Sequence, residues 1–143
     1  MYEVNIRWVG NHQYVAEGQS GHAIVLDIPE KSGGQNTGPH ATELLLIAVG
    51  KCSAVDVVNI LRKRRIDLKS LRVVVSGEIS ESYPKYFTRI NIKYVASGPG
   101  LTVEEVEKAV HLSHEKYCTV SNSLADKVEQ IITVEIAEEG ECA

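Results

Sequence analysis

Residues 44–61 read LLLIAVGKCSAVDVVNIL, a run in which apolar side chains would fall on almost every side of a helix. Just before it, Pro39 suits a first helical turn and Glu43 complements the positive end of the helix dipole. The run ends at residues 62–65 (RKRR), whose charges suit a helix C-terminus. A helix that is apolar on all sides is normally buried. The stretch therefore predicts a long, buried central helix.

Strand-like segments lie on both sides of this helix. Val4, Ile6 and Trp8 alternate with polar neighbours, as on a half-buried strand. The alternation and the turn residues predict six strands, at Glu3–Val9, Gln13–Glu17, His22–Ile28, Ser70–Ser80, Tyr86–Ser97 and Gln130–Ile136.

Two further helices are expected in the second half of the chain. Thr102 and Glu105 form a capping box, which opens an amphipathic helix that continues toward Tyr117. Residues 118–127 read as a short helix. The predicted order is β-β-β-α-β-β-α-α-β, an α+β fold, and we expect residues 1–143 to form a single domain.

Composition narrows the class of protein. The chain has 143 residues, 43% of them hydrophobic, and a net charge of −4, which argues against a nucleic-acid binder. The N-terminus carries charge where a signal peptide would be apolar, and no uninterrupted apolar run reaches the ~18 residues of a membrane span. Three cysteines are too few for a secreted disulfide framework. We expect a cytoplasmic protein with reduced thiols, no membrane partner, and neither a cofactor nor a metal.

Cys52 is the first candidate for chemistry, because it lies in the middle of the apolar run. A buried cysteine can also be no more than a small hydrophobic residue. Asp56 follows one turn later on the same helix face, and its charge would raise the pKa of the thiol. A reactive Cys52 would therefore need a cation beside Asp56, with Lys51 and Lys116 as the candidates.

Cys118 is the second candidate, at the start of the predicted short helix. A thiol in that position meets free backbone N–H groups and the positive end of the dipole, which lower its pKa. His114 lies four residues earlier and could stand over it. Alternatively, Cys118 fills a corner between two helices. Cys142, in the terminal tail, is expected to be an exposed bystander.

Glu43 is the third candidate. It precedes Cys52 by nine residues, so the two are ~13 Å apart along the helix and on roughly opposite sides. If Glu43 serves a thiol, that thiol belongs to a second copy of the chain. A two-fold dimer would also cover the apolar central helix. A purely local role at the helix N-terminus is equally compatible with the sequence.

Three segments resemble the signature regions of the OsmC/organic hydroperoxide resistance family: residues 38–46 (GPHATELLL), 50–56 (GKCSAVD) and 115–124 (EKYCTVSNSL). The resemblance covers essentially the whole chain and implies an intertwined homodimer with active sites at the subunit interface. It implies that Cys52 attacks an organic hydroperoxide and becomes a sulfenic acid, and that Cys118 resolves it as a disulfide. It also implies that Glu43 helps to position the substrate and the thiol.

The chain departs from that family at one position. The arginine that pairs with the glutamate comes from the turn after the first strand in the family, where this sequence has residues 10–12 (GNH). No arginine occurs between Arg7 and Arg62. The sequence therefore resembles the OsmC-like branch that keeps both cysteines and lacks a clear arginine. His12, Lys51, Lys116 and a reoriented Arg7 are the possible replacements.

The leading functional hypothesis is a thiol peroxidase for organic hydroperoxides, recycled by an unidentified thiol reductant. We expect an apolar substrate pocket, and its predicted lining is Leu45, Val49, Tyr117 and Leu124. The alternative is a non-catalytic dimer that senses redox state or binds a small hydrophobic ligand. A third possibility is a structural protein with two inert cysteines.

Overall fold

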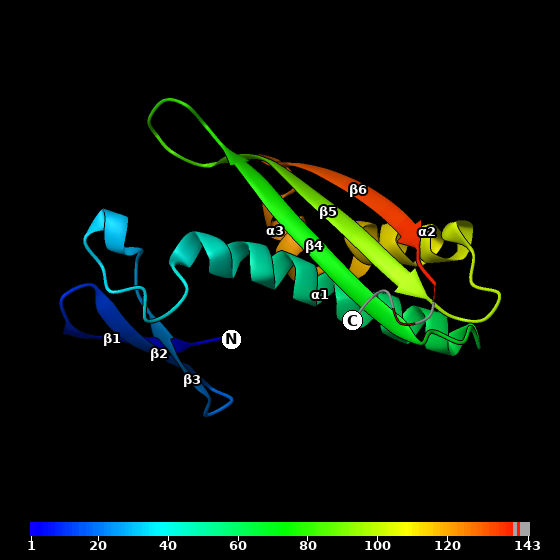
Figure 1. Ribbon diagram of the computed structural model, residues 1–143, viewed down its shortest axis with the longest axis horizontal. Coiled ribbons are helices and arrows are strands. Elements are labelled where there is room, and N and C mark those ends of the chain that lie inside the picture. The colour runs from blue at the N-terminus through cyan, green and yellow to red at the C-terminus, as the bar shows by residue number, and fades with distance from the viewer. Residues whose placement is uncertain (139, 141–143) are drawn as a thin grey trace. The chain divides into compact units, whose positions relative to one another are not determined.

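The computed structural model describes residues 1–138 and residue 140, and it divides into two compact units. Unit 1 comprises Met1–Leu45 and unit 2 begins at Leu46. The element order contains the predicted β-β-β-α-β-β-α-α-β succession, with a 3₁₀ turn (η1) and a π-helical turn (η2) added (Figure 1). The α+β prediction is confirmed. Cys142 lies outside the described residues.

Unit 1 is an antiparallel sheet in the order β1-β2-β3. Its elements are β1 (Val4–Gly10), β2 (Gln13–Gly18), β3 (Ala23–Leu26) and η1 (Glu30–Ser32). Val4, Ile6 and Trp8 share one face of β1, as the alternation predicts, but 66%, 58% and 63% of their surfaces are exposed. The prediction that this face is half-buried is therefore wrong for a single chain, since most of these side-chain surfaces stay open among the described residues.

Asp27 organises the loop that follows β3. Its carboxylate is buried and accepts hydrogen bonds from the backbone N–H groups of Ile28, Gln35 and Thr37 and from the Thr37 hydroxyl. The distances lie between 2.7 and 3.2 Å. One side chain thus supplies the acceptors for backbone donors spread over ten residues, which fixes the loop without a regular element.

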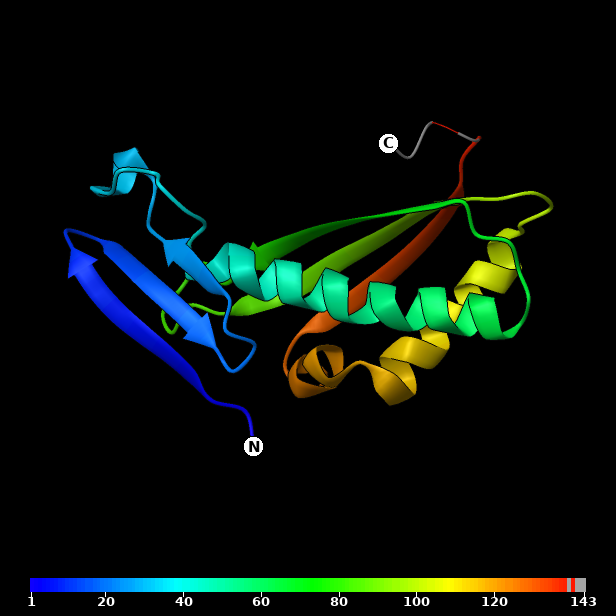
Figure 2. The ribbon, with the colours of Figure 1, turned by 90° about the horizontal axis from the view of Figure 1, so that it is seen from below.

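Unit 2 contains a three-stranded sheet in the order β4-β5-β6. The central strand pairs antiparallel with β4 and parallel with β6. The remaining elements of the chain are α1 (Ala41–Lys63), β4 (Ser70–Ile79), β5 (Phe87–Ser97), α2 (Val103–Leu112), η2 (Ser113–Tyr117), α3 (Thr119–Leu124) and β6 (Glu129–Ile136). From Leu46 on, α1 lies along one face of this sheet together with α2 and α3 (Figure 2).

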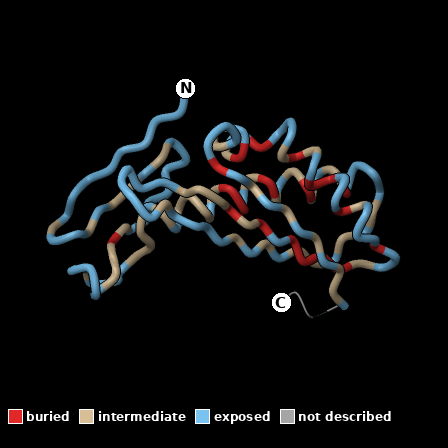
Figure 3. The backbone as a smooth tube through the Cα atoms, turned by 90° about the horizontal axis from the view of Figure 1, so that it is seen from above, coloured by how far each residue is buried: buried red, intermediate tan, exposed pale blue. Residues whose placement is uncertain are grey.

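Helix α1 is buried along one stripe and not on all sides. Val49, Ser53, Val57 and Leu61, spaced four residues apart, are fully buried, and the core of the chain gathers in unit 2 (Figure 3). Exposed apolar residues on the same helix include Val55, with 42% of its surface accessible. The prediction of an all-round buried helix is wrong for one chain, because apolar residues outside this stripe stay exposed in the part of the chain that the structure describes.

By length and composition, α1 could also cross a membrane, since an 18-residue window reaches a mean hydropathy of 1.9. The run is not uninterrupted, because Lys51 and Asp56 lie within it. The core helix of a soluble protein and a signal sequence meet the same criterion, so this measure alone does not assign α1 to a membrane.

Close packing brings α1 onto the sheet. Gly50 faces β4, where a Cβ atom would lie only 2.8 Å from the Cγ2 atom of Val75. One turn further on, Ser53 receives a hydrogen bond from the hydroxyl of Tyr94 on β5. Small side chains at 50 and 53 thus let the helix approach the strands closely. This approach carries Cys52, between them in sequence, to the inside of unit 2.

The predicted capping box at α2 is confirmed. The Thr102 hydroxyl accepts from the backbone N–H of Glu105, and the Glu105 carboxylate accepts from the backbone N–H of Thr102. The strand bounds differ from the predicted ones by one to two residues. The predicted helix at 118–127 is shorter in the structure and begins at Thr119.

Candidate active site

Cys118 stands at the N-cap of α3, as predicted. Its backbone is extended, with φ −73° and ψ 101°, and its sulfur accepts a hydrogen bond of 3.3 Å from the backbone N–H of Ser121. The residue is fully buried. The preceding π-helical turn closes through the N–H of Cys118, which donates to the carbonyl of Ser113 at 2.8 Å. The thiol is therefore held between two helical turns.

Burial raises the pKa of the Cys118 thiol to about 11. The hydrogen bond from the N–H of Ser121 acts in the opposite direction, whereas the neighbouring Cys52 and the charge of Asp56 add to the rise. The sequence-based expectation of a lowered pKa is wrong, because desolvation of the thiolate outweighs the donors at the helix start.

Cys52, on α1, is half-buried, and it lies close enough to Cys118 to raise the pKa of that buried thiol. Both thiols are free. Two cysteines separated by 65 residues of sequence are thus neighbours in unit 2, one from the central helix and one from the N-cap of α3. This is the arrangement that a pair of redox-active thiols requires.

Asp56 follows Cys52 by one turn, and its carboxylate accepts a hydrogen bond of 2.8 Å from the hydroxyl of Ser113. Neither predicted cation pairs with it. Lys116 places its amino group 5.4 Å from the ring centre of Tyr117, and Lys51 lines a hollow beside β4. No ion pair to Asp56 occurs among the residues that the structure describes. A hydroxyl, and not a cation, stabilises this carboxylate.

A buried chain of polar side chains runs beside the thiols. The Tyr94 hydroxyl lies 2.5 Å from the Ser53 Oγ and 2.8 Å from the Nε2 of His114. On its other side, His114 places Nδ1 2.6 Å from the Ser121 Oγ, which contacts the Oε1 of Gln130. Five elements are joined in this way: α1, β5, η2, α3 and β6.

Both titratable groups in this chain have shifted pKa values. Burial raises the pKa of Tyr94 to about 12, against the hydrogen bond with Ser53; the charges of Cys118, Asp56 and Cys52 contribute to the rise. Burial also lowers the pKa of His114, and nearby His111 lowers it further, while the hydrogen bond with Gln130 and the charge of Asp56 raise it. A neutral tyrosine and a neutral imidazole are therefore the forms that burial favours.

Sequence reasoning considered His114 as a neighbour of Cys118 but did not identify Tyr94, Ser53 or Gln130. One signal was available: Ser53 is a polar residue inside an otherwise apolar stretch, and buried hydroxyls need partners. The partner itself could not be found, because Tyr94 lies 41 residues further along the chain.

Glu43 lies in the exposed first turn of α1. Its carboxylate accepts from the backbone N–H of His40 at 3.1 Å and lies 3.7 Å from the imidazole Nε2 of the same residue. The local role at the helix N-terminus, one of the two open interpretations, is thus present in the structure. A role at the thiols of a second copy stays a prediction.

The four residues predicted to line a substrate pocket differ in exposure. Val49 is fully buried, Leu45 and Leu124 are half-buried, and half of the Tyr117 surface is exposed. Tyr117 lines a surface hollow of about 330 Å³ in unit 2, together with Asp56, Ile60 and Leu112, among others. A pocket shared by all four predicted residues stays a prediction.

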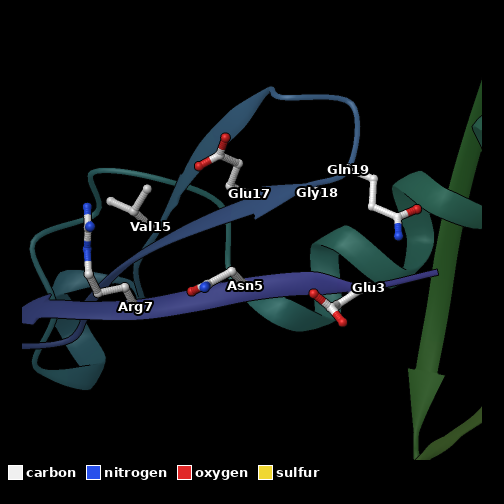
Figure 4. Close-up of a pocket in the computed structure, with 7 residues that line it drawn as sticks. All are labelled: Glu3, Asn5, Arg7, Val15, Glu17, Gly18 and Gln19. Carbon is white, nitrogen blue, oxygen red and sulfur yellow. The ribbon is translucent and has the colours of Figure 1, made fainter.

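Arg7, a possible replacement for the family's arginine, lies in a polar hollow of about 280 Å³ on unit 1 (Figure 4). It shares one face of the β1–β2 pair with Glu3 and Glu17, as residues two apart on a strand do. Its guanidinium therefore lies on the same sheet face as two carboxylates of unit 1.

The class of protein is defined by an α+β fold that brings together two free cysteines, one from a central helix and one from a helix start. Comparison with known proteins identifies the family: the OsmC-like protein profile matches residues 34–133. The Escherichia coli K12 protein YhfA is 38% identical over 126 residues, which cover 88% of this chain and 91% of that protein. The chain belongs to the OsmC-like family.

Solved structures agree with this assignment. A hypothetical protein from Aquifex aeolicus is 32% identical and superposes with a TM-score of 0.84 over 97% of this chain and 98% of that one. An organic hydroperoxide resistance protein OsmC from Legionella pneumophila has the same fold, with a TM-score of 0.71 and 19% identity over 94% and 96% of the two chains.

Proposed function

We propose that this protein reduces organic hydroperoxides with Cys52 as the attacking thiol and Cys118 as the resolving thiol. The observation that carries the proposal is that the two free cysteines are neighbours inside unit 2, close enough for Cys52 to raise the pKa of Cys118. Membership of the OsmC-like family supports a peroxide-related redox function, since relatives of the same fold are named organic hydroperoxide resistance proteins.

The environments of the two thiols support this division of roles. Cys52 is partly accessible, whereas Cys118 is fully buried and its pKa is raised to about 11. The more accessible sulfur meets the peroxide first. The buried, protonated thiol is protected from direct oxidation and becomes reactive only once its neighbour has been oxidised.

The reaction takes place in two steps. The Cys52 thiolate attacks the outer oxygen of the hydroperoxide, the O–O bond breaks, and the alkoxide leaves with a proton as an alcohol. The Cys118 sulfur then attacks the sulfenic sulfur of Cys52, an S–S bond forms, and water leaves. An external thiol reductant restores both cysteines by exchange.

A homodimer is part of the proposal. Exposed apolar residues on β1 and on α1, such as Trp8 and Val55, support a partner surface that a second copy would cover. In that dimer, Glu43 acts at the thiol pair of the other subunit. Leu45, Val49, Tyr117 and Leu124 line the apolar substrate pocket, which favours organic over hydrogen peroxide.

Substitution of Cys52 tests the proposal directly. We expect Cys52→Ser to abolish consumption of cumene hydroperoxide, while Cys142→Ser, a matched change of a cysteine outside the pair, retains it. In Cys118→Ser, the sulfenic acid at Cys52 should persist and be trapped by dimedone. Equal peroxide consumption by wild type and Cys52→Ser would refute the proposal.

A redox sensor or hydrophobic-ligand-binding protein is the second candidate. The observation that favours it is the pairing of Glu43 with His40 in place of an arginine, together with an Asp56 carboxylate that forms no ion pair with any described residue. This candidate predicts that one equivalent of cumene hydroperoxide oxidises Cys52 only slowly. A rapid, stoichiometric Cys52–Cys118 disulfide in peptide maps would exclude it.

A further inference from the structure

The buried polar chain beside the thiols has a proton arrangement that can be derived from its contacts. Gln130 donates from Nε2 to the carbonyl of Ser121 at 2.9 Å, which directs its Oε1 toward the Ser121 hydroxyl. An amide oxygen only accepts, so Ser121 gives its single hydroxyl proton to Gln130. The Nδ1 of His114, 2.6 Å from that hydroxyl oxygen, must then donate.

The other end of the chain imposes a second condition. The Ser53 hydroxyl lies 3.1 Å from the carbonyl of Val49 and 3.2 Å from that of Gly50, one helical turn back. When Ser53 donates to these carbonyls, Tyr94 donates to Ser53. The Nε2 of His114 must then donate to the Tyr94 oxygen, which makes His114 an imidazolium.

When His114 is a neutral imidazole, the same contacts are all satisfied once two hydroxyl groups reverse the direction in which they donate. With Nδ1 protonated, Nε2 becomes an acceptor, so Tyr94 turns its proton toward His114 and Ser53 turns its proton toward Tyr94. One proton gained or lost at His114 thus changes the direction of the Tyr94 and Ser53 hydroxyls without moving a heavy atom. A chain with two complete arrangements is suited to carrying a proton.

This chain adjoins the thiol pair at two points. Ser121 binds the Cys118 sulfur through its backbone N–H and the His114 ring through its hydroxyl. Tyr94 donates a hydrogen bond to Ser53, the residue that follows Cys52 on α1. Tyr94 is fully buried, so bulk water does not offer it a direct path for proton exchange.

We propose that Tyr94, backed by His114, is the proton carrier for the step in which Cys118 resolves an oxidised Cys52. The inference rests on the proposed function, with an organic hydroperoxide as the oxidant. As Cys118 attacks, its thiol proton passes to the Tyr94 oxygen while the Tyr94 proton passes to Nε2 of His114. In this proposed step Tyr94 exchanges protons with the reacting atoms, and His114 acts through it as a positioning residue.

The step is balanced in atoms and charge. The S–S bond forms from the electron pair of Cys118, which is oxidised, and the S–O bond of the Cys52 sulfenic acid breaks as that sulfur is reduced. The departing hydroxide takes a proton from Tyr94, which recovers one from His114, and leaves as water. His114 ends in its neutral form, so no net proton is gained or lost.

The charged and titratable groups around His114 come from every neighbouring element: Asp56 on α1, Tyr94 on β5, His111 on α2 and Cys118 at the start of α3. Gln130 on β6 adds a polar contact. Because burial lowers its pKa, His114 is neutral near pH 7 and free to accept the thiol proton. Protonation at lower pH blocks that acceptance, so closure of the disulfide should slow as pH falls.

The test is rapid-quench peptide mapping of the reduced protein after one equivalent of cumene hydroperoxide. In Tyr94→Phe we expect the Cys52 sulfenic acid to form at the wild-type rate and the disulfide to form about 100-fold more slowly, the low end of what a positioned acid–base group contributes. The pH dependence of closure should also be lost. Tyr83→Phe, at an exposed tyrosine, is the matched control.

Wild-type closure in D₂O provides a measurement that does not depend on folding of a variant, and a solvent isotope effect on closure alone is expected. Closure at the wild-type rate and pH profile in Tyr94→Phe, or no isotope effect, would overturn the proton-carrier role. Diamide separates the two proposals, because it closes the disulfide without peroxide. Slow diamide-driven closure in Tyr94→Phe would support Tyr94 even if the wild type consumed no hydroperoxide.

Discussion

Asp27 illustrates how much one residue can hold in place. Its buried carboxylate accepts from three backbone N–H groups and the Thr37 hydroxyl, and the Thr37 hydroxyl is the largest of the causes that lower its pKa to about 2. The pKa in the folded protein is therefore below the usual value of 3.8. The stabilisation is present above pH 4 and is lost as the pH falls toward 2.

We predict that Asp27→Asn lowers the free energy of unfolding of unit 1 at pH 7. As the pH is lowered, the free energy of unfolding should fall less in this variant than in the wild type. Asparagine offers one acceptor oxygen in place of two and does not titrate. Urea unfolding at pH 7 and pH 3, followed by fluorescence of the single tryptophan Trp8 on β1, measures both effects. Asp67→Asn, at an exposed carboxylate 3.0 Å from Lys69, should change little. An acid profile of Asp27→Asn identical to that of the wild type would contradict the prediction.

For single residues, the sequence predicts which side chains are candidates for chemistry better than it predicts the pKa values of those side chains. It identified Cys52 and Cys118 and the position of Cys118 at a helix start. It did not predict the raised pKa of Cys118, because that depends on atoms from other elements which remove water from the thiol. Tyr94 was missed for the same reason: its role depends on Ser53 and His114, which are distant in sequence.

At the scale of elements, α2 depends on the cap at its N-terminus. Thr102 and Glu105 satisfy each other's backbone N–H groups. We predict that Thr102→Ala lowers the free energy of unfolding of unit 2 by about 1 kcal/mol, the usual cost of losing a hydroxyl N-cap. Urea unfolding followed by circular dichroism measures it.

Glu105→Gln is the control for this prediction, because glutamine keeps an oxygen that accepts from the Thr102 N–H. It should retain most of the stability. An equal loss in Glu105→Gln would show that the charge of Glu105 near the helix dipole contributes as much as the Thr102 hydroxyl does.

Elements were predictable wherever a local pattern specifies them. Alternation identified the strands, and the Thr102–Glu105 pair identified the start of α2. The π-helical turn at Ser113–Tyr117 was not predicted, because it continues the apolar stripe of α2 and differs only in a hydrogen bond that reaches one residue further back.

At the scale of the whole molecule, the apolar surface requires an explanation. Ile47 and Val55, eight residues apart on α1, have 57% and 42% of their surfaces exposed, and the apolar face of β1 is also open. Sequence patterns predict that such residues are covered but do not say by which chain. The single-chain expectation failed here because the described residues of one chain leave these side chains exposed.

We predict that the mass of the protein in solution is twice the chain mass of 15.7 kDa. Val55→Asp should shift the equilibrium from the dimer toward the monomer. A carboxylate placed in an apolar interface loses its hydration without gaining a partner, which is costly. Analytical ultracentrifugation measures the mass, and circular dichroism checks that the variant is folded. Tyr83→Asp, at an exposed hairpin residue, should stay dimeric. A wild-type monomer at micromolar concentration would rule out the dimer.

The π-helical turn before Cys118 has a consequence for how this family can diverge. It contains one residue more than an α-helical turn, since the N–H of Cys118 reaches back five residues to Ser113. Loss of a single codon in this turn, such as that of Glu115, would leave an ordinary helix and a foldable chain. It would also rotate Cys118 by about 100° around the helix axis, away from Cys52. A deletion that preserves every cysteine could therefore separate a redox-active lineage from an inert one.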